Sequence, residues 1–492
     1  MKKNVFLPSA LSILAAISLA ALSCAQDEKN EAGGPPPESP WQLETEQEKL
    51  PAPELPEMDL GARDFVFLTN SHPFPIWDQR DIYAETENGD RINDAVYRRN
   101  SIIEAQFNCK IREMKLDAQP VIAQVKKFAL SGDDFADAVN PKLMFMDQLI
   151  ESSALFEFGQ LPHNDLSKPW WDPNCVRDLS VSGKIFGVAS DITLIDKGAT
   201  NAMVFKKQLH QDCNIENLYQ LVAEGKWTLD KLFELSRAVS KDLDGNGIRD
   251  DKDAYGLLYQ RDSVASFMAG AGGFIASKNE SDLPVMTLND DRTLGILDKI
   301  FDMLYNPEYC FHVMKFFDGT SVNFTDGMTA MFQNNQALFM WIRIADAENL
   351  RAMPADFGIL PLPKYDDRQP GYMAPVSSRT AIGTSVPISA KSAEESSAVL
   401  EAMAYHSRAI LQPEYYDVLL ASKVARDDES GEMLDIIYAN RVYDIGDAFD
   451  FGGIYTDLIY GSMDYNRNIA SMYEKKESAA SRDIEKLVGM IK

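Results

Sequence analysis

Twelve consecutive residues, DLDGNGIRDDKD (242–253), have the composition and spacing of a calcium-binding loop. Calcium loops of this length offer oxygen ligands from positions 1, 3, 5, 7, 9 and 12, around a glycine at position 6. Gly247 holds position 6, where a residue without a Cβ lets the chain turn sharply. All the ligands are hard oxygens, which favours calcium over zinc. The predicted ligands are Asp242, Asp244, Asn246, the Ile248 carbonyl, Asp250 and Asp253.

The last position of this loop departs from the usual pattern, because Asp253 replaces a glutamate. Its shorter side chain is less suited to binding an ion through two oxygens. The alternative is an acidic turn whose Asp and Asn side chains cap backbone N–H groups. Oxygens at every ligand position favour the metal site. We expect a structural calcium ion, because the loop lies between a predicted helix and strand and contains no substrate-facing motif.

The N-terminal residues have the features of a secretory signal. Lys2 and Lys3 precede an apolar segment, residues 5–22, which is followed by Cys24. Its end, ALSC, resembles that of bacterial lipoprotein signals, in which the cysteine is acylated and becomes the mature N-terminus. The alternative is a transmembrane anchor, because the segment is nearly long enough to span a bilayer. Both interpretations place the rest of the chain outside the cytoplasm.

The segment after Cys24 is acidic and rich in proline. Residues 25–62 contain seven prolines and ten Asp or Glu residues. Such a composition buries too little apolar surface to fold, so we expect a disordered tether between the membrane and a folded domain. The whole chain has a net charge of −27. This charge excludes nucleic acid as a partner, because polyanions are repelled.

Four cysteines follow Cys24, at positions 109, 175, 213 and 310. They form no CxxC pair and are too few to be the disulfide framework of a chain of this size. Buried thiols are the favoured interpretation, and a single disulfide is the alternative.

Hydrophobic patterning predicts a mixed α/β protein. A strand at 64–70, a helix near 92–103 and a strand at 109–116 form a βαβ unit with parallel strands, and a second such unit follows over 121–150. Thr228 is a good N-cap for a helix that ends just before the calcium loop. The loop is followed by the strand AYGLLY, and from Ala393 the pattern is mainly helical. The chain after the signal is long enough for two or three domains, or for one large two-lobed unit.

The order of these segments resembles the extracellular solute-binding proteins of bacterial ABC importers, in the group similar to maltose-binding protein. The most specific segment is KWTLDKLFELSRAVSKDLDGNGIRDDKDAYGL (226–257). Further matching segments cover most of the chain after the tether, at 89–108, 161–172, 183–191, 356–373 and 398–437.

The resemblance implies an α/β fold of the periplasmic-binding-protein type II class, with two discontinuous lobes and a ligand cleft at the hinge. The implied function is capture of an extracellular solute, most directly an oligosaccharide, and its delivery to the permease subunits of an ABC transporter. We expect a monomer, lipid-anchored at the cell surface or in the periplasm. The predicted parts are the signal 1–23, the tether 24–62, lobe 1 at 63–188 and 332–388, and lobe 2 at 189–331 and 389–492.

A sugar-binding cleft combines aromatic platforms for apolar C–H faces with polar side chains for hydroxyls. Trp77 follows the first strand, at the end where open α/β sheets bind ligands. The other candidate tryptophans lie in a proline-flanked loop and near the second crossover, and core packing is the alternative for each. The predicted ligand-binding residues are Trp77, Trp170, Trp171, Asp191, Trp341 and Arg343.

No enzyme motif is present. The five histidines form no HExxH, and the chain has neither GxSxG nor a GxxxxGK[ST] phosphate loop. We therefore expect a protein that is not an enzyme. A glycosidase carboxylate pair leaves no linear motif, so a surface glycoside hydrolase is the alternative function, and a glycan-binding adhesin is another.

Overall fold

The computed structural model describes residues 51–350, 353, 356–419 and 428–491. They belong to one compact unit, Ser39–Lys492. The predicted signal, Cys24 and the tether up to residue 50 lie outside the described residues. Among the helices that are described, none combines the length and the apolar character needed to cross a membrane.

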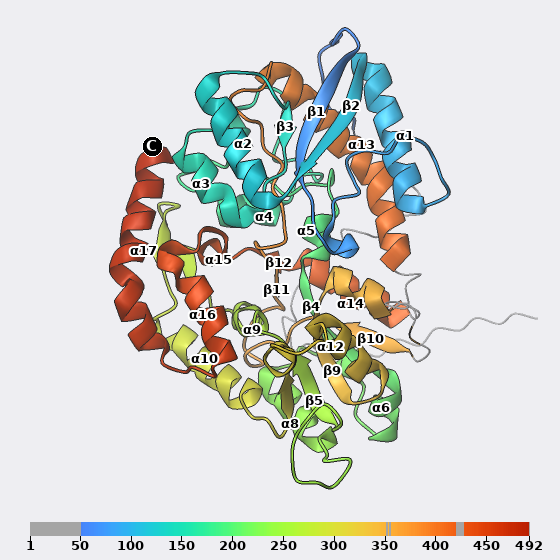
Figure 1. Cartoon of the computed structure of the whole chain (residues 1–492), viewed down its shortest axis with the longest axis vertical. Coiled ribbons are helices and arrows are strands. Elements are labelled where there is room, and N and C mark those ends of the chain that lie inside the picture. Colours follow the sequence, from blue (N-terminus) through green and yellow to red (C-terminus); the bar gives the residue numbers. More distant parts are fainter. Residues whose placement is uncertain (1–50, 351–352, 354–355, 420–427, 492) are drawn as a thin grey trace, which may run out of the picture. The chain divides into compact units, whose positions relative to one another are not determined.

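The first sheet is parallel and has the strand order β2-β1-β3 (Figure 1). Its strands are β1 (Arg63–Asn70), β2 (Cys109–Leu116) and β3 (Ala138–Val139). Helix α1 (Arg91–Phe107) connects β1 to β2, which confirms the predicted βαβ unit, and α2 (Ala118–Ser131) leads to β3. Phe65, Phe67 and Leu68 of β1 are fully buried in the core between these elements.

The second sheet has five strands in the order β10-β4-β9-β5-β8. They are β4 (Asn201–Lys206), β5 (Tyr255–Tyr259), β8 (Cys310–His312), β9 (Ala337–Arg343) and β10 (Phe357–Leu360). β4 runs antiparallel to β9 and β10, whereas β5 is parallel to β8 and β9. This sheet therefore joins segments from both sides of the predicted calcium loop.

The helix predicted before the loop is α8 (Leu229–Val239), and it packs on this second sheet. The Thr228 hydroxyl accepts a hydrogen bond from Lys231 N at 3.3 Å, which confirms the N-cap. At Gly256 of β5, a Cβ would lie 2.2 Å from Ser236 Cα of α8. Only glycine allows this close approach, which explains the Tyr-Gly pair after the loop.

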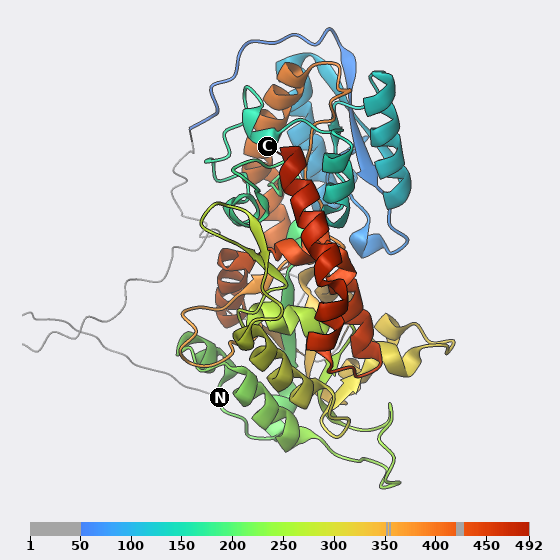
Figure 2. The same ribbon diagram turned by 90° about the vertical axis from the view of Figure 1, so that its left-hand side faces the viewer.

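The remaining elements surround the two sheets and the segments between them (Figures 1 and 2). The helices are α3 (Met146–Glu151), α4 (Pro173–Leu179), α5 (Ile195–Gly198), α6 (Lys207–Asp212), α7 (Leu218–Ala223), α9 (Ser263–Gly270), α10 (Asp291–Leu304), α11 (Val313–Phe317), α12 (Phe324–Gln333), α13 (Ala393–Leu419), α14 (Asp428–Ala439), α15 (Ile445–Phe449), α16 (Ile454–Met463) and α17 (Ile469–Ile491). Short strands pair as β6 (Ala276–Lys278) with β7 (Pro284–Met286) and β11 (Ala374–Pro375) with β12 (Arg441–Val442). Short 3-10 helices are η1 (Pro75–Trp77), η2 (Leu143–Phe145), η3 (Phe158–Gln160), η4 (Ile344–Leu350) and η6 (Phe451–Gly453).

Both lobes are discontinuous in sequence, in agreement with the predicted two-lobed α/β fold. Helix α13 returns to the first lobe and packs along α1. The predicted boundaries are nevertheless wrong in two places. Residues 332–388 contain β9 and β10, which join the second sheet, and residues 389–492 contain α13, which covers the first. The reason is that β9 is buried along nearly its whole length and takes β4 and β5 as hydrogen-bonding partners on its two sides.

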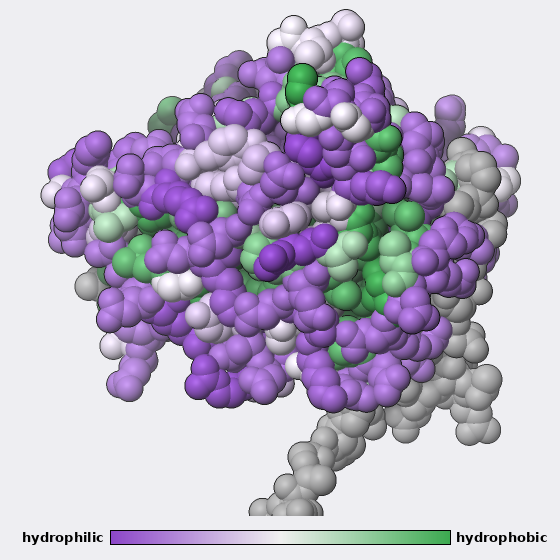
Figure 3. Space-filling model, turned by 90° about the horizontal axis from the view of Figure 1, so that it is seen from below, coloured by the Kyte–Doolittle hydropathy of each residue, from purple (hydrophilic) through white to green (hydrophobic). Residues whose placement is uncertain are grey.

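The four cysteines of the described part are free thiols, and those at 109, 175 and 310 are buried. Burial raises the pKa of Cys109 to about 11, so its thiol stays protonated. The exposed surface is mainly hydrophilic on the face drawn in Figure 3, as the acidic composition leads one to expect.

Candidate functional site

A cavity of about 690 Å³ lies at the carboxyl ends of strands from both sheets. It is lined by residues that follow β1 (72 and 74–77), by residues that follow β5 (260–262) and by Arg343 at the end of β9. This is the end of open α/β sheets where ligands bind. We call it the outer cavity; residues from the α11–α12 region, Asp346, Asn349 and Thr380 complete its wall.

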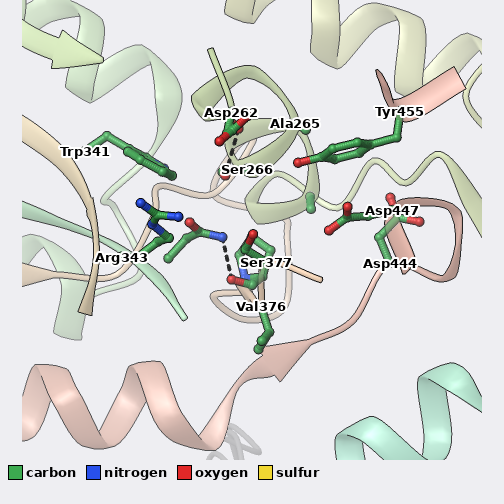
Figure 4. Close-up of a pocket in the computed structure, with 13 residues that line it drawn as sticks. Asp262, Ala265, Ser266, Trp341, Arg343, Val376, Ser377, Asp444, Asp447 and Tyr455 are labelled. Carbon is green, nitrogen blue, oxygen red and sulfur yellow. Dashed lines mark hydrogen bonds between the residues drawn. The ribbon is translucent and has the colours of Figure 1, made fainter. Parts of the chain in front are cut away.

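A narrower pocket of about 20 Å³, the inner pocket, shares Asp262 and Arg343 with the outer cavity. Figure 4 shows Trp341 and Arg343 on one side of it, and Tyr455, Asp444 and Asp447 on the opposite side. A space of this size holds about one water molecule. The inner pocket is therefore almost closed in this conformation, whereas the outer cavity is wide enough for a sugar unit.

Strand pairing explains why the side chains of Trp341 and Arg343 lie on the same face of the second sheet. Alternate side chains of a strand point to the same face of a sheet. Trp341 and Arg343 are two positions apart on β9, and Asn201 of β4 lies directly opposite Arg343 in the register. All three side chains therefore reach the inner pocket.

Two polar atoms in this group have no hydrogen-bond partner among the described residues: Trp341 Nε1 and Asn201 Oδ1. Trp341 is 1 % exposed and Asn201 is 3 % exposed. The other amide atom of Asn201, Nδ2, donates to the Pro375 carbonyl at 2.7 Å. A buried polar atom without a partner costs about 1–3 kcal/mol. A hydroxyl or a water molecule that accepts from Trp341 Nε1 would remove the first cost, and one that donates to Asn201 Oδ1 would remove the second.

Trp77 lies at the outer cavity, but its ring is not an open platform. The side chain is 7 % exposed and packs against Ile195, Ala345 and Ile382. The guanidinium carbon of Arg343 lies 4.3 Å from the ring centroid. The prediction that Trp77 stacks directly on a sugar is therefore corrected: the face of the ring is taken by the guanidinium of Arg343 in a cation–π contact.

The structure contradicts the prediction that Trp170 or Trp171 contacts ligand. Both rings are buried in the core, and they donate hydrogen bonds from Nε1 to Glu401 of α13 at 3.0 and 2.9 Å. Phe158 and Tyr405 pack edge-on against them. The proline-flanked loop thus anchors α13 to the first lobe and lines neither cavity.

Asp191 is likewise structural. It is 5 % exposed and pairs with Arg408 at 3.1 Å and Lys197 at 3.4 Å. Neither the outer cavity nor the inner pocket includes it. The prediction of a hydroxyl contact failed because two cations already pair with this carboxylate, Lys197 six positions further on and Arg408 of α13.

Two carboxylates on one side of the inner pocket, Asp444 and Asp447, were not predicted from the sequence. Burial raises the pKa of Asp447 to about 7 and that of Asp444 to about 6. Ser378 donates to the Asp447 carboxyl from Oγ at 2.6 Å and from N at 3.2 Å. Near neutral pH, Asp447 can therefore donate or accept a hydrogen bond. The only sequence signal was the N-cap position of Asp444 before α15, which is typical of helix starts in general.

The predicted calcium loop brings three carboxylates together. Oxygens of Asp242, Asp244 and Asp253 lie within 4.8 Å of one another. Backbone N–H groups of Gly245 and Gly247 donate to Asp242, and these hydrogen bonds lower the pKa of its carboxyl. Asp250 is not part of this group; its carboxylate accepts from Lys252 N at 2.9 Å.

The ends of the predicted calcium loop are joined by a pair of backbone hydrogen bonds. Lys241 and Ala254 bond to each other in both directions, at 3.0 Å each. The loop is thus a closed turn, and none of its residues lines the outer cavity.

No family model and no curated protein matches the sequence. Solved structures match its fold. An ABC substrate-binding protein from Listeria monocytogenes, in complex with cycloalternan, has 13 % identity and a TM-score of 0.52, covering 87 % of this chain and 99 % of its own. A cyclo/maltodextrin-binding protein complexed with maltotetraose has 12 % identity and a TM-score of 0.55, covering 87 % and 96 %.

A third match is an ABC transporter solute-binding protein from Thermotoga lettingae, bound with α-D-tagatose. Its identity is 10 % and its TM-score is 0.54, covering 87 % of this chain and all of its own. The chain has the two-lobed fold of ABC-importer solute-binding proteins, as the sequence resemblance predicted.

Proposed function

We propose that this protein captures an oligosaccharide between its two lobes and delivers it to the permease of an ABC transporter. One observation carries the proposal: Trp341 Nε1 and Asn201 Oδ1 are buried without partners beside a cavity at the carboxyl ends of strands from both sheets. The fold and the sugars bound by proteins of the same fold support this choice of ligand.

Capture and release require that the ligand contact both lobes. The outer cavity offers His72 and Phe74 from the first lobe, and Asp262 and Arg343 from the second. Only a ligand that binds the closed form better can shift the hinge equilibrium towards closure. Delivery also requires release, so we expect a dissociation constant on the order of 1 μM, about −8 kcal/mol.

Trp341→Phe tests the proposed contact, because it removes the indole N–H while keeping an aromatic ring. We expect the affinity for the bound oligosaccharide to fall about 5- to 10-fold, the value of one net hydrogen bond. Calorimetry with a panel of neutral and charged oligosaccharides measures this change.

Trp227→Phe is the matched control for the tryptophan test. Trp227 is fully buried in the same lobe, lines neither cavity, and donates from Nε1 to the Pro361 carbonyl at 3.0 Å. We expect this variant to lose stability and keep its affinity. Absence of binding to every sugar in the panel would contradict the proposed ligand, and steady release of shortened glycan would favour a hydrolase instead.

We also propose that Cys24 carries a lipid anchor, on the basis of the ALSC sequence at the end of the apolar segment. We expect Cys24→Ser to release the protein from the membrane fraction or to leave the precursor uncleaved. Fractionation followed by mass measurement of the N-terminus checks this expectation. Full processing with unchanged membrane attachment would refute it.

A structural calcium ion in the loop at 242–253 completes the proposal. The donor set fits, because the three converging carboxylates are hard oxygen ligands. Arg249, which pairs with Asp253 at 3.8 Å, is the one cation beside them among the described residues. Asp242, Asp244 and Asp253 would hold the ion, with Asn246 and the Ile248 carbonyl as further ligands. The ion would fix the turn between α8 and β5.

A further inference from the structure

We infer that the inner pocket receives a protonated amino group of the ligand, and that the natural ligand is an amino sugar with a free amine. The inference rests on the proposed function and narrows its substrate class. It depends on the charges that line the two cavities, on the size of the inner pocket, and on the atoms of its wall that have no hydrogen-bond partner.

The cationic side chains that line the two cavities are neutralised by carboxylates. Arg261 pairs with Asp262 at 3.1 Å, and Arg343 pairs with Asp346 at 3.4 Å. Burial lowers the pKa of His72, so its ring carries no charge at neutral pH. These groups therefore leave no net positive charge for an anionic ligand.

Other carboxylates of the same walls have no cationic partner. Asp326 of the outer cavity, and Asp444 and Asp447 of the inner pocket, make no ion pair with any described cation. The nearby Arg379 is paired with Asp450 at 3.6 Å. Asp326 is exposed, as many carboxylates of this acidic chain are, but Asp444 and Asp447 are only 8 % and 9 % exposed. Burial of an unpaired charge is costly, so these two carboxylates point to a cationic group on the ligand.

The two buried carboxylates differ in how many hydrogen bonds they already accept. Asp444 accepts from three backbone N–H groups as the N-cap of α15 and the neighbour of β6. Asp447 accepts from Ser378 alone, from Oγ at 2.6 Å and from N at 3.2 Å. A carboxylate has about four acceptor positions, so Asp447 has room for donors from a ligand. Burial raises the pKa of Asp447 to about 7, and a cation beside it would lower that pKa and favour the charged form.

The inner pocket has the size of one amino group. Its volume of about 20 Å³ holds one water molecule, and an –NH3+ group is of similar size. Asp262 and Arg343 line both this pocket and the outer cavity, so the two adjoin. A sugar ring in the outer cavity can place an amine in the inner pocket, whereas an acetylated amine is too large for it. A lone water molecule is the alternative occupant, and the experiment must separate the two.

The atoms of the pocket wall fit an amine that has a hydroxyl beside it. Asn201 Oδ1 is an acceptor without a partner, and the Tyr455 hydroxyl points into the pocket from the opposite side (Figure 4). Together with Asp447 they offer acceptors for the three N–H bonds of an ammonium group. Trp341 Nε1 is a donor, which an ammonium group cannot satisfy, so it requires a hydroxyl oxygen. An amine and a hydroxyl on one ring describe an amino sugar and not a simple alkylamine.

The test is calorimetry of the full chain with oligosaccharides of matched length that carry free amines, acetylated amines or hydroxyls only, and with methylammonium alone. We expect the free-amine oligosaccharide to bind at least about tenfold more tightly than either counterpart, because it adds a charge-assisted hydrogen bond. Asp447→Asn removes the charge with little change of shape. We expect this variant to bind the free-amine sugar about tenfold more weakly and to keep its affinity for the neutral sugar.

Asp450→Asn is the matched control, because Asp450 is a partly buried carboxylate three positions further on that lines neither cavity. Melting curves verify that both variants fold. The comparison of the three sugars uses the parent protein alone, so it decides the inference even if Asp447→Asn does not fold.

Equal affinity for the free-amine and hydroxyl sugars, or tighter binding of the acetylated sugar, would overturn the inference and leave the proposed function intact. Such a result would assign the inner pocket to water. Methylammonium binding as tight as that of the free-amine sugar would overturn the assignment of a sugar. Equal losses in Asp447→Asn and Asp450→Asn would overturn the role of Asp447. Absence of binding to every sugar would overturn the proposed function itself.

Discussion

Replacing Glu401 by alanine is expected to lower the free energy of unfolding by about 3–5 kcal/mol. The carboxylate is 1 % exposed and accepts hydrogen bonds from Trp170 and Trp171 at 3.0 and 2.9 Å. It also accepts from Asn164 Nδ2 and Asp165 N, both at 3.3 Å. Removal of the carboxylate leaves buried donors without an acceptor and a gap between the proline-flanked loop and α13.

Chemical denaturation monitored by tryptophan fluorescence measures the loss of stability in Glu401→Ala. Glu401→Gln should fall between the parent and alanine, because its amide keeps one acceptor oxygen but replaces the other with a donor. Glu394→Ala is the control, since Glu394 lies on the same helix with a side chain that is 66 % exposed. Equal stability of the Glu401 and Glu394 variants would contradict a structural role for the two tryptophans.

Removal of calcium is expected to lower the melting temperature of the parent by several degrees or more. An ion that binds only the folded state stabilises it by mass action, about 4 kcal/mol when free calcium is a thousand times the dissociation constant. The proposed ligands are carboxylates within 4.8 Å of one another, which repel when no cation lies between them. Calorimetric scans of metal-stripped protein, with and without added calcium, measure the effect.

Asp244→Ala should make the melting temperature insensitive to calcium, while the fold survives because Asp244 is exposed. Asp251→Ala is the control, because Asp251 belongs to the same loop but holds no ligand position. The same response to calcium in both variants would refute the site. Ligand affinity should change only indirectly, because the loop contributes no residue to the outer cavity or the inner pocket.

Features that depend on neighbouring residues could be predicted from the sequence. The βαβ unit, the Thr228 cap and the turn around Gly247 all follow from hydrogen bonds and side-chain spacing within short segments. Trp341 and Arg343 were chosen as candidates because each lies near a predicted crossover, and the structure places both at the inner pocket. Their common face follows from the two-residue period of a strand. The fold class could also be predicted, because it follows from the order of such short segments along the chain.

Contacts between distant segments were decided only by the tertiary structure. Trp77 and Trp171 both lie in loops, yet Glu401, 230 positions beyond Trp171, fixes one in the core, while Arg343 covers the other at the outer cavity. The lobe boundaries failed for the same reason, because β9 could be assigned only once β4 and β5 were seen on its two sides. Whether a side chain is buried or paired depends on the residues that contact it as well as on its own type. No local sequence pattern specifies a contacting residue hundreds of positions away.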